Sequence, residues 1–385
     1  MAYTSSLQLP TKHLLLPRPH RHTPSFVPAA SKINGAPRVN GKVRINGDGE
    51  NGSNGGHVDR IHLSVSSRAQ DGSGLRVAYQ GAPGAYSEFA ATTALPGCAT
   101  LPCRALADAL SAVERGAADR AVLPVESTME GTALRNYDLL LRHGLVVCQE
   151  VSLFVHYSLL AIPGVRAAQV RRVISHPMAL AHCGRALARL GVDGEPVEDT
   201  AGALEMLRSG RMLDTAAIAS PRAAGMYGLH VLAHGLQDES WNVTRFLLLS
   251  RPPPVTLPPP VDADAKTSMV VAHRGGSMMV LLKVLSAFSS RNVNLTKLEV
   301  INNQGQEGSD SSGTATGARP PVVILDTGAR GKPTLRAFPH VLYVDCEGAA
   351  HDPRVREAIR EIDKFAVFVR VLGCYAADST VYDLQ

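Results

Sequence analysis

The sequence lacks several features that would place it at once in a broad class of proteins. No stretch of its 385 residues approaches the run of about 20 apolar residues that a transmembrane helix requires, so no membrane partner is expected. Its six cysteines include no C-x-x-C pair and no accompanying histidine cluster at zinc spacing. Reduced thiols are therefore expected, with neither a disulfide framework nor a metal site.

Most of the chain also carries no net charge. Seven of the 39 basic residues but only two of the 34 acidic residues lie in residues 1–50, which leaves 32 of each sign in the remainder. Because residues 51–385 have no net charge, they do not provide the basic surface that binds a phosphate backbone. Nucleic acid is therefore not expected as a partner.

The basic first segment contains no acidic residue before Asp48 and no long apolar core of a secretory signal. Its many Ser, Thr, Pro, Arg and His residues are typical of a transit peptide, and a basic tail without a targeting role is the alternative. Residues 46–56 are rich in Asn and Gly and indicate a linker. Residues 1–60 are interpreted as a transit peptide and disordered linker, which predicts import into the chloroplast stroma.

From Leu75 onward, short apolar strands alternate with amphipathic helices. Strands are predicted at residues 75–81, 120–126 and 214–220, and helices at residues 104–116 and 179–190. This alternation predicts an α/β domain over residues 75–250 with a largely parallel sheet. Ligands bind at the ends of the strands in such sheets.

A second domain is expected after a proline-rich segment. Residues 251–266 contain too many prolines for a helix or an inner strand and are predicted to form a stiff spacer. The periodicities of residues 267–385 follow the order βαββαβ, which predicts a ferredoxin-like plan with two helices on one face of an antiparallel sheet. The apolar residues expected on one face of its first helix are Met278, Leu282, Leu285 and Phe288.

The first candidate site follows the strand predicted at residues 75–81, where Gly84 precedes Tyr86 and Ser87 at a helix start. Backbone N–H groups at such a start favour an anion. The segment is neither a P-loop nor a dinucleotide-binding G-x-G-x-x-G motif, and a plain turn is the alternative.

The second candidate site consists of Glu126, Ser127 and Thr128, at the end of a buried strand. Polar groups in this position are placed where α/β sheets bind ligands. A helix cap, with Glu130 completing a capping box, is the alternative.

The third candidate site combines Ser175 and His176 with Asp199 and Thr200. His176 follows an apolar strand and could act as an acid or a base near neutral pH, although a lone histidine before a proline is more often structural. Asp199 or Thr200 resembles a helix cap.

The fourth candidate site, residues 242–246, leads into an apolar strand. It places the hydroxyl of Thr244 beside the guanidinium of Arg245, whose fork is well suited to bind a carboxylate. A surface charge is the alternative interpretation of the arginine.

These segments occur in an order that resembles one known family. The strings YQGAPGAYS, PVE-x-x-x-x-G, HPMALAHC, DTAGA, DTAAIAS and NVTRF follow one another along the chain. Together they closely resemble the prephenate dehydratase family, and TALRNYDLLLRHGL, AAGMYGL and HGLQDESWNVTRF resemble its plant arogenate dehydratase branch. The resemblance extends from Leu75 to the C-terminus, and the βαββαβ unit is similar to an ACT domain.

The resemblance implies a two-lobed catalytic domain similar to periplasmic binding proteins, with the active site in the cleft. The family's substrate, prephenate or arogenate, is a cyclohexadienol that loses its ring hydroxyl and its ring carboxylate. Because aromatisation drives this reaction, the resemblance implies no cofactor.

The resemblance also assigns roles to residues. Thr244 is expected to assist the departing hydroxyl, Arg245 to bind a carboxylate, and Phe246 to give the cleft an apolar floor. The residues expected to bind the substrate are Gly84, Tyr86, Ser87, Ser175, His176, Thr200 and Asn242.

Glu126, Asn242 or the contacts around Ser127 and Thr128 are expected to polarise the hydroxyl of Thr244, and catalytic roles are assigned to Glu126, Ser127 and Thr128. Ser127 stands where the family has an asparagine and lacks the paired donor and acceptor of an amide. Two alternatives to an enzyme therefore stay open: a catalytically silent amino-acid-binding paralogue and a solute-binding protein.

An ACT domain in this family senses phenylalanine between neighbouring subunits, so phenylalanine is a candidate effector and a homo-oligomer, a dimer or a tetramer, is expected. Gly276, Ser277 and Glu299 are the expected regulatory residues. The family's Glu-Ser-Arg-Pro turn is replaced here by Glu299-Val300-Ile301-Asn302. Loss of the guanidinium and of the proline ring predicts weak or absent inhibition by phenylalanine.

Overall fold

The computed structural model describes residues 74–198, 200–252, 265–273, 278–302, 321–326 and 333–383. The leader and linker predicted at residues 1–60 lie outside these ranges, as do residues 253–264 of the spacer predicted at residues 251–266. None of the helices that the structure describes is long and apolar enough to cross a membrane.

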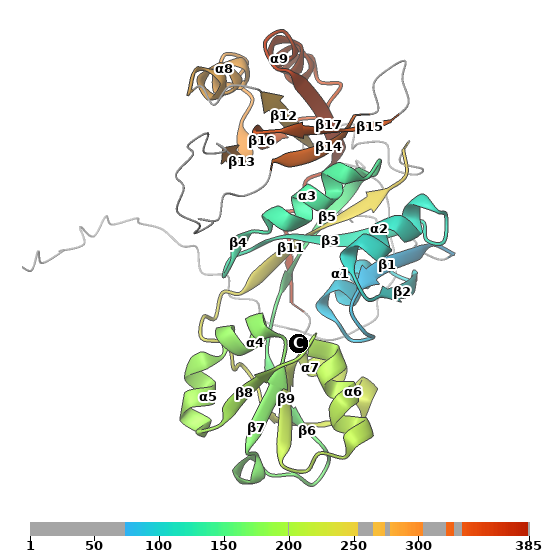
Figure 1. Ribbon diagram of the computed structural model, residues 1–385, viewed down its shortest axis with the longest axis vertical. Coiled ribbons are helices and arrows are strands. Elements are labelled where there is room, and N and C mark those ends of the chain that lie inside the picture. The colour runs from blue at the N-terminus through green and yellow to red at the C-terminus, as the bar shows by residue number, and fades with distance from the viewer. Residues whose placement is uncertain are drawn as a thin grey trace, which may run out of the picture. The chain divides into compact units, whose positions relative to one another are not determined.

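The first lobe is built on one part of a large mixed sheet (Figure 1). Its strands, in spatial order, are β5 (Val146–Phe154), β11 (Val243–Ser250), β3 (Arg120–Ser127), β1 (Arg76–Gln80) and β2 (Ala99–Cys103), and β4 (Gly131–Thr132) pairs with β3. The strands β1, β2 and β3 are parallel, whereas β11 is antiparallel to both of its neighbours. The prediction of a largely parallel sheet is therefore only partly right, because β11 re-enters the lobe in the opposite direction.

Helices cover both faces of this part of the sheet. They are α1 (Tyr86–Ala94), α2 (Leu106–Glu114) and α3 (Leu134–Arg142). Helix α1 packs on the face that carries Phe246 and Leu248, and α2 and α3 pack on the face that carries Leu247 and Leu249. This alternation of buried side chains sets which residues of β11 face which neighbour.

The second lobe has its own mixed sheet. Its strands, in spatial order, are β10 (His230–Ala233), β6 (Ser158–Ala161), β9 (Thr215–Ala219), β7 (Arg172–Ser175) and β8 (Asp193–Pro196). Its α-helices are α4 (Pro177–His182), α5 (Gly184–Leu190), α6 (Thr200–Gly210) and α7 (Pro221–Tyr227). The single helix predicted at residues 179–190 is interrupted at Cys183, where one helix ends and the next begins.

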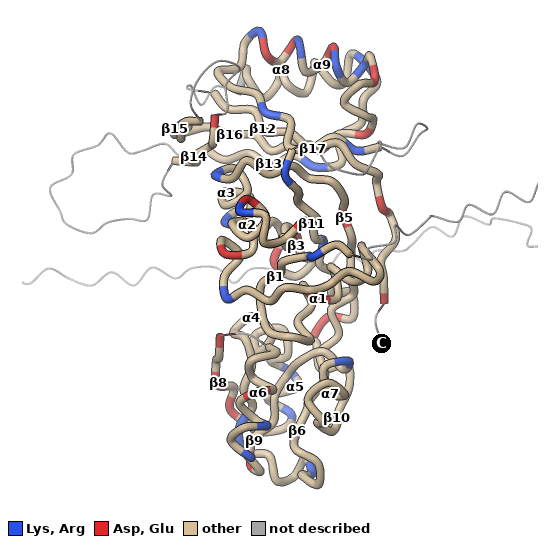
Figure 2. Tube along the Cα trace, turned by 90° about the vertical axis from the view of Figure 1, so that its right-hand side faces the viewer, with Lys and Arg blue, Asp and Glu red and all other residues tan. Residues whose placement is uncertain are grey.

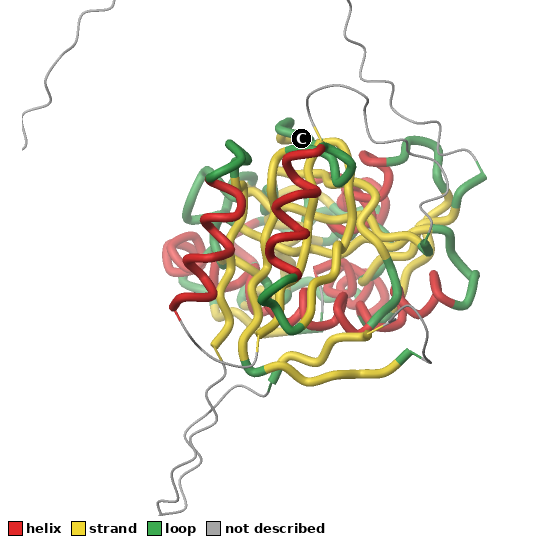
Figure 3. Tube along the Cα trace, turned by 90° about the horizontal axis from the view of Figure 1, so that it is seen from above, coloured by secondary structure: helices red, strands yellow, loops and turns green. Residues whose placement is uncertain are grey.

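The C-terminal unit, residues 265–383, follows the predicted βαββαβ plan. Its elements are β12 (Ala265–His273), α8 (Met278–Ser289), β13 (Leu295–Asn302), β16 (His340–Glu347), α9 (Pro353–Asp363) and β17 (Phe368–Ala376). The strands pair antiparallel in the spatial order β13-β16-β12-β17, with α8 and α9 together on one face (Figure 3). A hairpin of β14 (Val322–Asp326) and β15 (Thr334–Phe338), which the sequence did not predict, is inserted between β13 and β16.

The buried face of α8 differs from the prediction. Val284, Ala287 and Phe288 are buried, whereas Leu282 is 51% exposed. Because α8 is apolar on nearly all sides, the spacing of its apolar residues does not select one face. The prediction was therefore right for Phe288 and wrong for Leu282.

The C-terminal unit packs against the first lobe through the sheet face opposite α8 and α9 (Figure 2). Strand β17 pairs with β5 at Gly373 and Val147, which joins the two units in one sheet. The guanidinium of Arg370 donates to the carbonyls of His143 at 2.8 Å and Leu145 at 3.1 Å. Burial lowers the pKa of Arg370, so these carbonyls compensate for the lost hydration of its charge.

We expect Gly373→Ala to destabilise the protein, because a Cβ at this position would overlap the backbone and side chain of Val147. Such overpacking costs about 1–3 kcal/mol. Denaturant unfolding would measure the loss, with Gly225→Ala as control. No atom lies within 4 Å of a Cβ at Gly225, so this helical substitution should be neutral or stabilising. Equal stability of Gly373→Ala and the native protein would contradict the proposed close approach.

Candidate active site

A cavity of about 240 Å³ is lined by residues of both lobes. The first lobe contributes Gln80, Gly81, Ala85, Tyr86, Ser87, Pro124, Thr244 and Phe246. The second lobe and the segment that enters it contribute Val155, Tyr157, His176, Ala179, Glu198 and Thr200. The cavity thus brings together residues from three of the four candidate sites.

Strand β11 directs Thr244 and Phe246 to this cavity. Thr244 is half-buried, and no residue that the structure describes forms a hydrogen bond with its hydroxyl. Phe246 is buried and adds an apolar wall. The hydroxyl of Thr244 is therefore available to a ligand in partly apolar surroundings.

Two helices begin at the cavity wall. Helix α1 starts at Tyr86 after the left-handed Gly84, and α6 starts at Thr200. Their first residues, including Ser87, line the cavity. Because the start of a helix carries the positive end of its dipole, both starts favour an anionic group of a ligand.

The structure separates Ser175 from His176 in the third candidate site, and Asp199 of that site lies outside the described residues. His176 lines the cavity, and its Nδ1 accepts a hydrogen bond from the N–H of Met178 at 3.2 Å, which places a proton of the neutral ring on Nε2. Ser175 is fully buried and donates to the carbonyl of Ile218 at 2.6 Å. Its position does not support the expected contact with substrate.

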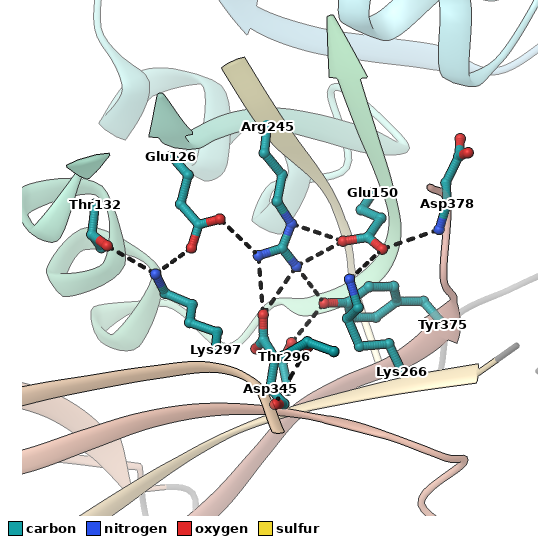
Figure 4. A network of polar contacts seen from close by, with 11 residues as sticks. Glu126, Thr132, Glu150, Arg245, Lys266, Thr296, Lys297, Asp345, Tyr375 and Asp378 are labelled. Carbon is teal, nitrogen blue, oxygen red and sulfur yellow. Dashed lines mark hydrogen bonds and ion pairs between the residues drawn. The ribbon is translucent and has the colours of Figure 1, made fainter. Parts of the chain in front are cut away.

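Arg245 lies on the opposite side of β11, in a buried ion cluster (Figure 4). Its Nε donates to Glu150 at 2.7 Å, and both terminal nitrogens donate to Asp345 at 3.0 Å. Tyr375 accepts at 3.0 Å, and Glu126 lies at 3.4 Å. Since these groups occupy the guanidinium, the geometry does not support the expectation that Arg245 binds a substrate carboxylate.

Two lysines of the C-terminal unit complete the cluster. Lys266 donates to Glu150 at 2.7 Å, and Lys297 pairs with Glu126. Burial alone would raise the pKa of Glu126, but Arg245 and Lys297 outweigh burial and hold that pKa below its usual value. Glu126 is therefore an ionised structural partner in this arrangement.

The remaining residues of the second and fourth sites secure the start of β11. Thr128 donates through its hydroxyl to the carbonyl of Trp241 at 2.8 Å and accepts from the N–H of Val243 at 3.0 Å. The amide of Asn242 donates to the carbonyl of Val155 at 3.1 Å. Ser127 accepts from the N–H of Met129 within a turn that leads to β4, and because the next helix, α3, starts only at Leu134, the helix-cap alternative for this segment is wrong.

A second cavity of about 340 Å³ lies beside these groups. It is lined by Glu126, Ser127, Thr128, Gly131, Thr132, Ser152, Val243 and Arg245. Thr244 lines only the first of these two cavities. The residues expected to polarise Thr244 are therefore grouped around a different cavity.

Three polar residues of the cavity lining were not predicted from the sequence: Gln80, Tyr157 and Glu198. Gln80 is the last residue of β1, and Glu198 comes two residues after the end of β8; polar side chains commonly contact ligands at these carboxyl ends of strands. Tyr157 lies in a connection between the lobes and gave no local signal.

Of the three expected regulatory residues, Glu299 lies in the described part of the chain. Gly276 and Ser277 lie outside the described residues, and Glu299 is on β13 opposite Tyr343 of β16. In the part of the chain that the structure describes, no group of three or more His, Cys, Asp or Glu residues could hold a metal ion.

The sequence of the chain is similar to one protein family and to named relatives from plants. Residues 77–254 match the model of prephenate dehydratase. The chain is 47% identical over 318 residues to arogenate dehydratase 1 of Petunia hybrida, a match that covers 82% of this chain and 70% of the relative. It is also 47% identical over 318 residues to arogenate dehydratase/prephenate dehydratase 6, chloroplastic, of Arabidopsis thaliana. This match covers 82% of this chain and 72% of the relative.

Solved structures are similar as well. GqqA, described as a novel type of quorum quenching acylase, has a TM-score of 0.64 and 32% identity, with 79% of this chain and 98% of GqqA covered. Prephenate dehydratase of Arthrobacter aurescens, solved in complex with L-Phe, has a TM-score of 0.64 and 27% identity, with 79% and 90% covered.

We expect Arg245→Met to act mainly on stability. It would leave the nearly inaccessible carboxylates of Glu150 and Asp345 without their shared cation, and breaking such a pair costs about 3–5 kcal/mol. Because the pKa of Glu126 is lowered in the folded protein, its stabilising effect is present above its unfolded pKa and lost as pH falls through its folded pKa. The stability difference, measured by denaturant unfolding, should therefore shrink in acid.

The control for this variant is Arg336→Met, which removes a half-exposed pair with Asp326 in the β14–β15 hairpin. This pair should contribute only about 0–1 kcal/mol. Reduced substrate affinity of Arg245→Met at unchanged stability would restore the carboxylate-binding role.

Proposed function

The chain belongs to the prephenate dehydratase family, and we propose that it is a decarboxylating dehydratase of phenylalanine biosynthesis. It would convert arogenate to phenylalanine, prephenate to phenylpyruvate, or both. The observation that carries this proposal is the hydroxyl of Thr244, which has no partner among the described residues and lies in a cavity with the starts of α1 and α6. A chloroplast location, specifically the stroma, is proposed from the leader and from relatives named chloroplastic.

In the proposed mechanism, the helix starts at Ser87 and Thr200 hold the carboxylates of the substrate. Thr244 donates a hydrogen bond to the ring hydroxyl, which leaves as water after gaining one proton. His176 lines the same cavity as a neutral ring with a proton on Nε2, so its part is to donate a hydrogen bond, and the proton that completes the water comes from solvent. The apolar wall at Phe246 disfavours the hydrated ring carboxylate and so assists its loss as carbon dioxide.

The electrons of the broken carbon–carbon bond enter the new aromatic ring as the carbon–oxygen bond breaks. The reaction therefore consumes one proton and requires no external oxidant or reductant. This balance agrees with a site built from hydrogen-bond donors and apolar walls, and it supports an enzyme without a redox cofactor.

The silent-paralogue alternative rested on Ser127 in place of an asparagine. In the structure Ser127 accepts from the N–H of Met129 and lines the second cavity. Its hydroxyl thus serves the turn after β3. The position of Ser127 gives this alternative no specific support.

We propose that the C-terminal unit is an ACT domain within a homo-oligomer, a dimer or a tetramer. Its βαββαβ topology supports this assignment. The Arthrobacter aurescens relative was solved with L-Phe, so phenylalanine is the candidate effector. Because Val300, Ile301 and Asn302 replace the expected Ser-Arg-Pro after Glu299, we expect phenylalanine to inhibit weakly or not at all.

The function is tested by adding arogenate or prephenate to the full-length protein and measuring formation of phenylalanine or phenylpyruvate. We expect Thr244→Val to lower kcat by about 10²–10⁴ with little change in KM, because the hydroxyl acts mainly on the departing group. Thr92→Val is the control, since Thr92 bonds only to carbonyls of its own helix. Native-like turnover by Thr244→Val would rule out the assigned role of this hydroxyl.

A further inference from the structure

We infer that Glu198 is a specificity-determining residue that favours a substrate with an ammonium group, and hence arogenate over prephenate; this inference rests on the proposed function. Glu198 lines the cavity two residues after the end of β8 and two residues before the start of α6. Strands β7 and β8 are parallel, and the N–H of Val197 donates to the carbonyl of Ser175 at 2.9 Å. Glu198 and His176 therefore leave the same edge of the second-lobe sheet.

The carboxylate of Glu198 forms no hydrogen bond or ion pair with any residue that the structure describes. Other acidic side chains near the cavity are already held. Glu88 accepts from the N–H of Gly84 at 2.6 Å and from Thr100 at 2.9 Å, and Glu130 contacts His182 at 2.6 Å. Glu198 is thus an acidic group of the cavity that is available to a ligand.

Among the described residues, those that line the cavity include no lysine and no arginine. An anionic substrate entering it meets the free carboxylate of Glu198 without a basic side chain in the lining to neutralise it. Such a carboxylate repels other anions and attracts a cation. The lining is therefore more compatible with a ligand that carries a positive group of its own.

The two candidate substrates differ in this property. Both carry two carboxylates, but arogenate has an ammonium group where prephenate has a keto oxygen. Glu198 can pair with the ammonium group, while the keto acid offers it only acceptors and negative charge. Discrimination then arises from attraction of one substrate and repulsion of the other.

A purely structural explanation makes a different prediction. An acidic residue close to the start of α6 also stabilises the helix dipole. If that were the whole role of Glu198, its neutralisation would lower thermal stability and leave the ratio of the two substrates unchanged.

The test is Glu198→Gln in the full-length protein, with kcat/KM measured for arogenate and for prephenate. We expect the ratio of arogenate to prephenate efficiency to fall about two- to fivefold, mainly through a higher KM for arogenate, as the loss of one ion pair to the exposed carboxylate of Glu198 predicts. Glu198→Asp should keep most of the preference because it keeps the charge.

Glu205→Gln is the matched control, because it removes the same charge from an exposed position of α6 outside the cavity lining. An unchanged ratio in Glu198→Gln, or the same change in Glu205→Gln, would overturn the inference. If the native protein turned over neither substrate, the proposed function would fail. Calorimetric affinities for the same two compounds would then still decide whether Glu198 favours the ammonium group.

Discussion

The buried ion cluster around Arg245 is the constraint on which the arrangement of the first lobe and the C-terminal unit depends. Arg245 comes from β11, Glu150 from β5, and Asp345 from β16 of the C-terminal unit. Buried charges are costly unless each has its partners in good geometry. The cluster is complete only when both units are folded and docked, so folding of the catalytic strand and docking of the C-terminal unit are energetically coupled.

The two faces of strand β11 carry different kinds of side chains. One face carries Arg245 into the ion cluster, and the other carries Thr244 and Phe246 into the cavity. Its pairing with β3 and β5 on both sides fixes the strand, and Thr128 anchors its beginning. Strong charges are therefore held behind the sheet, while a neutral hydroxyl and an aromatic ring face the ligand.

Much of this arrangement was predictable from local sequence. Strands at β1, β3 and β9 and the plan of the C-terminal unit follow from periodicity, and the family resemblance identified Thr244 and His176. The opposite placement of Arg245 also had a signal, because neighbours in a strand point to opposite faces. A residue between Thr244 and Phe246 could not share their cavity while the strand stays regular.

Other features had no local signal. The partners of Arg245 lie 95 and 100 positions away along the chain, and nothing in the sequence around them indicates their approach. The apolar pattern of α8 fits more than one buried face, so only tertiary packing decides which side is covered. These features depend on contacts between distant segments, which periodicity does not encode.

The origin of the cluster in two units bears on how sequence variants of this protein are interpreted. A substitution at Asp345 lies outside the segment that matches the prephenate dehydratase model, residues 77–254, yet it removes a partner of the strand that carries Thr244. Its effect would reach the active site without passing through any effector. Assigning a variant to a catalytic or a regulatory class by its position along the chain would therefore be wrong for the residues of the ion cluster. These residues come from both units and act together through their charges.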